Sequence, residues 1–431
     1  MLRVIAIILT GIITSFYFFP FEFSFLPGIN TKMLMASISI FVLAVRLAKE
    51  SMGRINKDFF LLSLWGILVS LAGLIAVTYN NTNDYTYASY IMSMWVWLGG
   101  AYIVINCIRW VHGLVSVRLV AHYLIGVCVF QCIIALLIDS HEPIKNLVHT
   151  YVAGFDWVDF EQLEKGERLY GIGATLDVSG LRFSAVLVMI SYLISKSDVR
   201  TNNVKMILYL MTFFVIIIVG NMMSRSTLVG LGLSLVYWIF LIMIGEEHKI
   251  LFKWLLIVGS VVTVIVVCLY NFNISFRDNF RFAFEGFFSL WEKGMWQVNS
   301  NDILKNMYIF PDNLKTWLIG DGYFENPYYT DPNYLGPRTL GYYMNTDVGY
   351  LRFIFYSGLI GLGIFIIYFV KSTKICVRRF SKYKVLFLML LAVNFICWFK
   401  VATDIFLVFA LFLCIGQEEN RKYEESLLEN Q

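Results

Sequence analysis

Long apolar runs separated by short charged breaks repeat along most of the chain. A helix needs about 20 mostly apolar residues to cross a bilayer, because hydrocarbon offers no partners for backbone N–H and C=O groups. Twelve runs come close to that length. They cover residues 2–19, 33–48, 59–79, 87–108, 119–138, 181–194, 206–222, 228–244, 254–270, 348–370, 385–399 and 403–415. The pattern predicts an all-α polytopic membrane protein with about 12 transmembrane helices; because runs 181–194 and 403–415 are short, ten or eleven remain an alternative.

Composition supports the membrane assignment. Hydrophobic residues make up 58% of the 431 positions and charged residues 15%, against about 25% charged residues in soluble domains. The lipid bilayer is therefore an expected partner. The formal net charge of +4 is too small to favour nucleic acid as a partner.

The distribution of Lys and Arg predicts the topology. Basic residues concentrate in alternate loops, which include Lys49, Arg54, Arg118 and Arg378, whereas residues 80–86 contain none. By the positive-inside rule, we expect both termini to be cytoplasmic and the loops at 140–179 and 271–346 to face outward. We therefore divide the chain into helices one to nine with an outer loop near 140–179, a large outer loop, three further helices, and a cytoplasmic tail. These parts cover residues 1–270, 271–346, 347–416 and 417–431.

The large outer loop, residues 271–346, combines aromatic and charged residues. In its first part, aromatic residues recur at three- or four-residue intervals, which predicts one face of a helix lying along the membrane surface; they are Phe276, Phe280, Phe284, Phe288 and Trp291. Arg277, Arg281 and Glu285 recur four apart on an adjacent face. This interfacial helix is either an anchor or the floor of a groove for a lipid-linked substrate. Later in the loop, Tyr323, Tyr342 and Tyr343 belong to a tyrosine-rich segment that would stack on sugars or pack the loop.

Arginines at the outer ends of spans are the strongest local signal. Arg182, Arg225 and Arg352 all lie there in the predicted topology, and an arginine at the bilayer centre costs at least about 2.5–3.5 kcal/mol. The alternatives are snorkelling to headgroups and buried ion pairs. Guanidinium groups bind phosphate oxygens through paired hydrogen bonds, which suits a diphosphate. We expect the three arginines to gather about one anionic carrier, joined by further loop arginines at positions Arg168, Arg277, Arg281 and Arg338.

A base is needed if a sugar hydroxyl is to attack. Asp347 lies where the large loop re-enters the membrane and is the favoured base, with helix N-capping as its alternative role. The chain contains no Asp-x-Asp triplet and no Cys/His spacing typical of zinc sites. The sequence therefore predicts a reaction that needs neither a metal nor another cofactor.

Four segments together resemble the bacterial O-antigen polymerase (Wzy-type) and O-antigen ligase superfamily. They read ERLYGIGATLDVSGLRFS, GNMMSRSTLVGLGLS, IGDGYF and NTDVGYLRFIFYSGLIGLGIF. The resemblance covers about the latter two thirds of the chain, and it implies a GT-C-like membrane glycosyltransferase fold. It also implies that Arg225 is the Ser-Arg motif arginine, in contact with undecaprenyl diphosphate. Asp347 stands where the ligase pattern usually has histidine, which favours the polymerase.

The resemblance implies a polysaccharide polymerase in lipopolysaccharide biosynthesis. Such an enzyme transfers the growing undecaprenyl-diphosphate-linked oligosaccharide onto a new lipid-linked repeat unit at the periplasmic face of the inner membrane. Asp347, Arg225 and Arg352 would be its catalytic residues, and Arg182 would help to hold the diphosphate. A chain-length regulator and a flippase would be its protein partners. The alternatives are an O-antigen ligase and, in a different class, a flippase or transporter for lipid-linked oligosaccharide.

Overall fold

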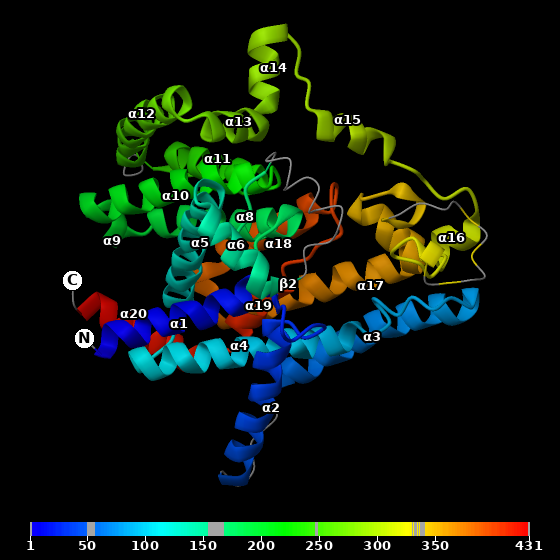
Figure 1. Cartoon of the computed structure of the whole chain (residues 1–431). Coiled ribbons are helices and arrows are strands. Elements are labelled where there is room, and N and C mark those ends of the chain that lie inside the picture. Colours follow the sequence, from blue (N-terminus) through cyan, green and yellow to red (C-terminus); the bar gives the residue numbers. More distant parts are fainter. Residues whose placement is uncertain are drawn as a thin grey trace.

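The computed structural model describes residues 2–49, 57–153, 168–245, 249–329, 331, 334, 336 and 341–429. The chain is an all-α polytopic membrane protein, as the apolar pattern predicts (Figure 1). Within the described ranges, eight helices are long and apolar enough to cross a membrane. They are α3 (Lys57–Asn80), α4 (Tyr90–His112), α5 (Val117–Ser140), α8 (Leu176–Ile194), α10 (Asn203–Met223), α11 (Thr227–Ile244), α12 (Lys249–Phe272) and α17 (Gly349–Arg379).

Shorter elements connect and cover these helices. The described strands form one small antiparallel pair, β1 (Glu22–Phe23) with β2 (Val152–Ala153). The other helices are α1 (Leu2–Phe18), α2 (Thr31–Lys49), α6 (Glu142–Tyr151), α9 (Ser197–Arg200), α13 (Ile274–Ala283), α14 (Glu285–Lys293), α15 (Asn299–Asn306), α16 (Leu314–Leu318), α18 (Lys384–Cys397), α19 (Phe406–Leu413) and α20 (Gln417–Glu429), with 3-10 turns η2 (Pro327–Tyr329), η3 (Tyr343–Asn345) and η4 (Ser381–Tyr383).

The last two predicted spans are a broken hairpin inside the bundle. α18 has 14 residues and α19 has eight, and an eight-residue helix is about 12 Å long, too short for a hydrocarbon core of about 30 Å. Every residue of α19 is buried. Irregular backbone at membrane depth is tolerated where protein surrounds it, and residues 398–405 between the two helices meet that condition in part, with Trp398, Val401 and Ile405 buried.

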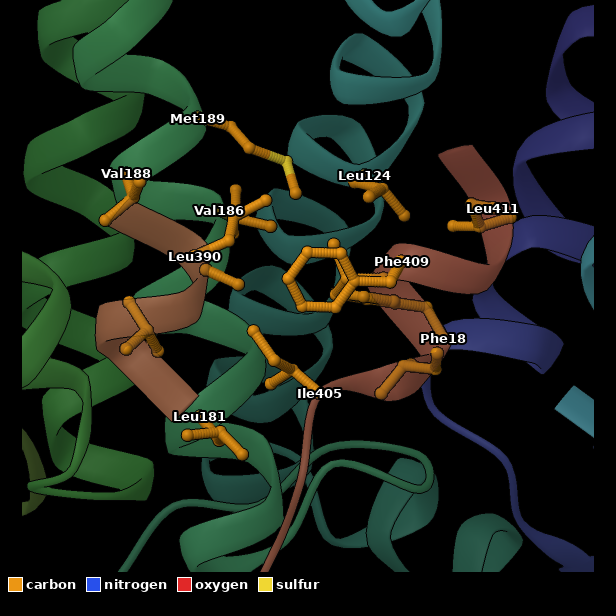
Figure 2. Close-up of a cluster of buried hydrophobic side chains, with 14 of the residues drawn as sticks. Phe18, Leu124, Leu181, Val186, Val188, Met189, Leu390, Ile405, Phe409 and Leu411 are labelled. Atoms are coloured by element: carbon orange, nitrogen blue, oxygen red, sulfur yellow. The ribbon is translucent and has the colours of Figure 1, made fainter. Parts of the chain in front are cut away.

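α8 is the central helix of the bundle. From Ser179 to Ile194 every one of its residues is buried, whereas most of α12 faces outward. Figure 2 shows the apolar core around α8, where Val186 and Met189 lie near Leu390 of α18, Phe409 of α19 and Phe18 of α1. The segment that carries Arg182 is therefore enclosed by neighbouring helices on all sides.

Small residues let α8 and α11 approach closely. A Cβ atom added to Gly230 would lie 2.4 Å from the Cα atom of Ser184. The Ser184 hydroxyl accepts a hydrogen bond from the Gly230 amide (2.9 Å) and donates one to the Ser226 carbonyl oxygen (2.8 Å). Small residues and hydroxyl hydrogen bonds of this kind are typical of helix contacts in membranes. They fix the turn before α11 against the start of α8.

α17 is interrupted at Gly358, where the Gly-Asp-Gly part of the large loop docks. Gly358 has φ 67°, which breaks the helical backbone. The amides of Asp321 and Gly322 donate to the Phe355 and Tyr356 carbonyl oxygens at 2.6 and 3.1 Å. These are carbonyls that a continuous helix would bond internally, so the loop satisfies the groups that the break leaves free. The glycines of IGDGYF thus have a structural role in holding the loop.

The two ends of the bundle differ in their chemistry. We call one the basic end, because Arg118, Arg378 and Arg379 lie there in ion pairs, near the described termini (Figure 1). We call the other the loop end, since it carries the described parts of the connections after α1, α3, α5 and α12 and the start of α17. All residues proposed from sequence as catalytic lie toward the loop end.

Candidate functional site

The Ser224–Ser226 turn, between α10 and α11, is joined to the first turn of α8. Asp177 Oδ1 accepts hydrogen bonds from the Ser226 hydroxyl (2.7 Å) and the Ser224 hydroxyl (3.1 Å). Gly180 makes room for the turn, because a Cβ atom there would lie 2.5 Å from Ser224 Oγ. The Ser-Arg-Ser sequence and the Asp-x-x-Gly sequence of α8 therefore form one unit.

Lys400 adds a cation to this unit from the break between α18 and α19. Its ammonium group lies 3.1 Å from Asp177 Oδ1 and 3.5 Å from Ser226 Oγ. Both side chains of the ion pair are partly exposed, at 29% for Lys400 and 24% for Asp177. The broken hairpin thus delivers a charged group to the loop end, which a continuous apolar helix would not do.

Asp347 lies next to this group. Burial, together with the negative charge of Asp177, raises the pKa of Asp347 to about 7, although Arg352 and Lys400 act in the opposite direction. Its nearest cation is Arg352, at 3.8 Å. In the described part of the chain we find no hydrogen bond to its carboxyl group. A carboxyl group with a pKa near neutrality and a free oxygen is suited to accept a proton.

Asp347 does not cap a helix in the structure. The N-cap residue of α17 is Val348, and no side chain caps this helix. Instead, the Thr346 hydroxyl accepts a hydrogen bond from the Val348 amide at 3.3 Å. The position of Asp347 at the membrane re-entry therefore has no explanation in helix capping.

Arg352 is buried on the other side of Asp347, under the large loop. It donates to Glu325 at 2.5 Å and to the Phe324 carbonyl oxygen at 3.2 Å. Its guanidinium group lies over the rings of Phe324 (3.7 Å to the centroid) and Tyr342 (4.1 Å). Tyr342 is 37% exposed, so a partly exposed aromatic ring lies together with a cation and the carboxylate of Glu325 here.

Arg225 points away from Asp177, into a basic pocket. It donates to Glu285 at 2.7 Å, to the Phe282 carbonyl oxygen at 2.8 Å and to Ser300 at 2.8 Å. We call the space beside it the arginine pocket. This pocket has a volume of about 670 Å³ and is lined by Arg168, Arg225, Arg281, Phe282, Glu285, Phe288, Ser289, Glu292, Lys293, Gln297, Asn299, Ser300 and Ile303.

Three arginines proposed from sequence therefore share one pocket. Arg168 and Arg225 lie over the same ring, Phe282, at 5.1 and 4.1 Å. Arg281 lies over Phe288 at 4.7 Å and pairs with Glu292 at 2.7 Å. Among the described residues we find no ion pair for Arg168. Four basic side chains, including Lys293, face two carboxylates here, so the pocket favours an anion.

Arg182 lies apart from Arg225 and Arg352. It is buried inside the bundle with its guanidinium group 5.4 Å from the centroid of Phe19. The charged groups in its electrostatic surroundings are Asp404, in the α18–α19 break, and Lys32 of α2. Within the described ranges, no contact joins it to either other arginine. The expected gathering of all three is not observed: Arg225 lies in the arginine pocket, Arg352 beside Asp347, and Arg182 near Asp404 and Lys32.

The interfacial helix expected across residues 276–291 is two helices. The chain breaks at Phe284, where α13 ends and α14 begins, so Arg281 and Glu285 do not pair. Phe276, Phe280 and Phe284 pack against the core, whereas Trp291 of α14 is 90% exposed. Arg277 remains at the surface beside Asp278, at 3.8 Å, and outside the arginine pocket.

The tyrosines of the large loop divide into two groups. Tyr323 donates to Asp331 at 2.6 Å, and its ring centroid lies 5.4 Å from that of Tyr343. These two tyrosines therefore pack the loop. Tyr342 faces Arg352, as described above, and remains available to a ligand. Arg338 lies outside the described residues.

The sequence gives only weak evidence that four residues belong to the site. Glu285 and Glu325 balance Arg225 and Arg352, while Asp177 and Lys400 form the central ion pair. A charge at the edge of an apolar run marks Asp177 and Lys400, but nothing in the sequence gives their pairing across 223 positions. Within the described ranges, no group of three His, Cys, Asp or Glu side chains could hold a metal ion.

Comparison of the chain with known protein families, with curated proteins and with solved structures finds no match.

Proposed function

We propose that this protein is a polysaccharide polymerase that joins lipid-linked glycan units at the outer face of a bacterial inner membrane. The observation that carries the proposal is the arrangement around Asp347. A carboxyl group with a pKa of about 7 lies between an ion pair, Asp177–Lys400, and a buried cation, Arg352. The site lies at the loop end, directly before α17, where we place the headgroup of a lipid-linked substrate.

The reaction is transfer of a glycan from one lipid diphosphate to a sugar hydroxyl. Asp347, in its ionised form, accepts the proton of the acceptor hydroxyl. The hydroxyl oxygen forms a bond to the anomeric carbon of the donor glycan, and the bond from that carbon to the diphosphate oxygen breaks. Undecaprenyl diphosphate leaves with its charge, and the product is the acceptor lipid carrying the lengthened glycan.

The arginine pocket would receive the departing diphosphate. Arg168, Arg225 and Arg281 supply planar donors that stay charged at working pH, and preorganised donors stabilise charge that develops in the transition state. Glu285 and Glu292 occupy two of these arginines in the described structure. A bound diphosphate would compete with these carboxylates for the two arginines.

The sugar units would lie on the Arg352 side. The exposed face of Tyr342 offers a stacking surface, and Glu325 accepts hydrogen bonds from hydroxyl groups. Asp347 lies between this surface and the Asp177–Lys400 pair. In this proposal, the phosphate end of the substrate lies at α13–α15 and its glycan end lies at the large loop.

One observation supports a second function, transport of lipid-linked oligosaccharide. Lys32, Arg182 and Asp404 lie within the bundle in mutual electrostatic reach, and charged residues inside membrane segments often line transport paths. We prefer the polymerase, because Asp347 lies beside Arg352 and near the Asp177–Lys400 pair at the loop end, where the arginine pocket also lies.

The test is the product formed from a radiolabelled lipid-linked repeat unit. The purified full chain in nanodiscs would be given this substrate, and the products would be separated by length. A ladder of longer glycans supports the polymerase. Transfer to lipid A core alone would show a ligase, and movement across the bilayer without a new bond would show a flippase. Lys305→Gln, an exposed substitution outside the arginine pocket, serves as the active control.

The proposed reaction also requires other proteins. A flippase must supply the repeat unit at the outer face, and a chain-length regulator would limit the ladder. Adding such a regulator to the same nanodisc assay should shorten the distribution of lengths without changing the linkage.

A further inference from the structure

A groove on the bilayer side of the bundle, between α1 and α5, has no part in the proposed reaction. We call it the α1–α5 groove. Its volume is about 560 Å³, within the range of about 300–1,000 Å³ that is usual for ligand sites. It is lined by Ile7, Ile8, Gly11, Ile12, Ser15, His112, Leu119, His122, Tyr123, Gly126, Val127 and Phe130. Its walls are apolar except at one end.

Two glycines give the groove its depth. A Cβ atom added to Gly11 or to Gly126 would meet no atom within 4 Å. Glycine destabilises a helix interior by about 1 kcal/mol relative to alanine. Close packing does not explain the presence of these two glycines, because the space beside each of them is open. Ile8 and Phe130 on the walls are 57% and 47% exposed. The groove is thus open along its length to the bilayer.

The polar end of the groove lies at the basic end of the bundle. His112 and Tyr123 are hydrogen-bonded at 2.9 Å, and Arg3 lies within electrostatic reach of His112. His122, deeper in the groove, has Arg118, Lys205 and Asp198 around it. The charged groups that act on these two histidines are three cations and one carboxylate, whereas the rest of the lining, apart from Ser15, is apolar.

We propose that the α1–α5 groove binds one anionic phospholipid, with an acyl chain over Gly11 and Gly126 and the phosphate against Arg3 and His112. An apolar trench that ends in basic and hydrogen-bonding groups matches the two halves of such a lipid. If the basic end faces the cytoplasm, as the Lys and Arg distribution predicts, the lipid belongs to the inner leaflet. This site does not depend on the polymerase reaction.

The acyl part of the proposal is tested by filling the groove. Gly11→Leu with Gly126→Leu would be compared with the full wild-type chain and with Gly232→Leu plus Gly363→Leu. Both control glycines also have no atom within 4 Å of an added Cβ, and they lie on α11 and α17. Native mass spectrometry of protein released from nanodiscs would count bound phospholipid. We expect one retained lipid in the wild type and the control, and loss in the groove variant.

The headgroup part is tested by charge. In nanodiscs with equal phosphatidylglycerol and phosphatidylcholine, the wild type should retain the anionic lipid preferentially. Arg3→Gln should lower that preference by about fivefold, the contribution of one basic residue near anionic lipid. The proposal is overturned if the wild type retains no lipid, if the groove variant retains as much as the wild type, or if the control loses it equally. Equal retention of both lipids, or a preference that Arg3→Gln leaves unchanged, overturns the headgroup assignment. Gly126→Leu alone replaces the double variant should the latter fail to fold.

Discussion

The basic end and the loop end of the bundle use charged residues in different ways. At the basic end, Asp58 and Asp198 are each held by arginine side chains. Asp58 pairs with Arg378 and Arg379, and Asp198 binds Arg118 through both oxygens. At the loop end, Asp347 stands 3.8 Å from Arg352, beyond hydrogen-bonding distance. A paired carboxylate holds helices together, whereas a carboxyl group left between charges keeps its capacity to take a proton.

The polar side chains of the C-terminal helix are also engaged in structural contacts at the basic end. Glu419 of α20 binds Arg109 through both oxygens and also accepts from the Val115 amide. Asn420 accepts from the Val117 amide at the start of α5. These bonds join α20 to the start of α5 and to Arg109. At the basic end these side chains therefore have a structural role, whereas we propose a chemical role for Asp347 at the loop end.

The largest expected effect is that of Asp347→Asn. The amide cannot accept the acceptor proton, so elongation should fall by about 10²–10⁴-fold, the usual contribution of a general base. Thermal unfolding should be unchanged or slightly raised, because a buried carboxyl group is removed. The elongation rate on lipid-linked repeat units and the melting temperature check these outcomes. Elongation at the wild-type rate would remove Asp347 from the mechanism.

Arg225→Ala should lower elongation by about 10²–10³-fold, as for loss of one preorganised donor. Arg225→Lys should recover little of this, since an ammonium group cannot form a paired contact with phosphate. The glycan ladder measures both variants against Lys305→Gln. Because Arg225 also binds the Phe282 carbonyl oxygen, melting temperatures are compared as well. A normal ladder in the Ala variant would contradict the assignment of the arginine pocket.

Asp198→Asn, at the basic end, should lower stability and leave the elongation rate unchanged, which is the reverse of the effect expected for Asp347→Asn. The substitution leaves the partly buried Arg118 without its carboxylate, and the cost of breaking a fully buried pair, about 3–5 kcal/mol, is the upper bound. The expected result is a lower unfolding temperature with elongation per folded molecule unchanged. Chemical denaturation in detergent and the ladder assay measure the two quantities. Loss of elongation in fully folded protein would mean that the two ends are coupled.

A smaller effect is expected at the break in α17. Gly358→Ala places a Cβ at φ 67°, 2.1 Å from the Leu318 carbonyl oxygen, so the Gly-Asp-Gly loop should lose its dock. Strained positions of this kind cost about 1–3 kcal/mol. Gly363→Ala, in the same helix and with open space around it, is the matched control. Protease cleavage in the large loop should increase for Gly358→Ala alone.

The sequence predicts helices well and their partners poorly. Apolar length predicts twelve spans, and eight of them correspond to helices long and apolar enough to cross a membrane. The helix predicted across Arg281 and Glu285 is broken at Phe284 by tertiary contacts, and Glu285 turns to Arg225, 60 positions away. The length of α19 also escapes prediction, because a buried half-helix is as apolar as a spanning one.

Arg182 illustrates the same limit. Its place near the outer end of an apolar run predicts a phosphate contact, yet its surroundings are the ring of Phe19 and the partly buried charges Asp404 and Lys32. The position of a residue along a helix does not reveal which residues of other helices surround its side chain. By contrast, Arg168, Arg225 and Arg281 were expected to contribute to one positive site, and the arginine pocket contains all three.

The pH dependence of the elongation rate tests the role of Asp347 most directly. A base acts in its unprotonated form, so with a pKa of about 7 for Asp347 the rate should rise as pH increases through 7 and level off above it. Arg225→Lys should lower the curve without moving its midpoint. If a single group with a pKa of about 7 controls the rate, the rate at pH 5 should be about 100-fold below its plateau. A rate that is flat between roughly pH 5 and pH 9 would contradict the account.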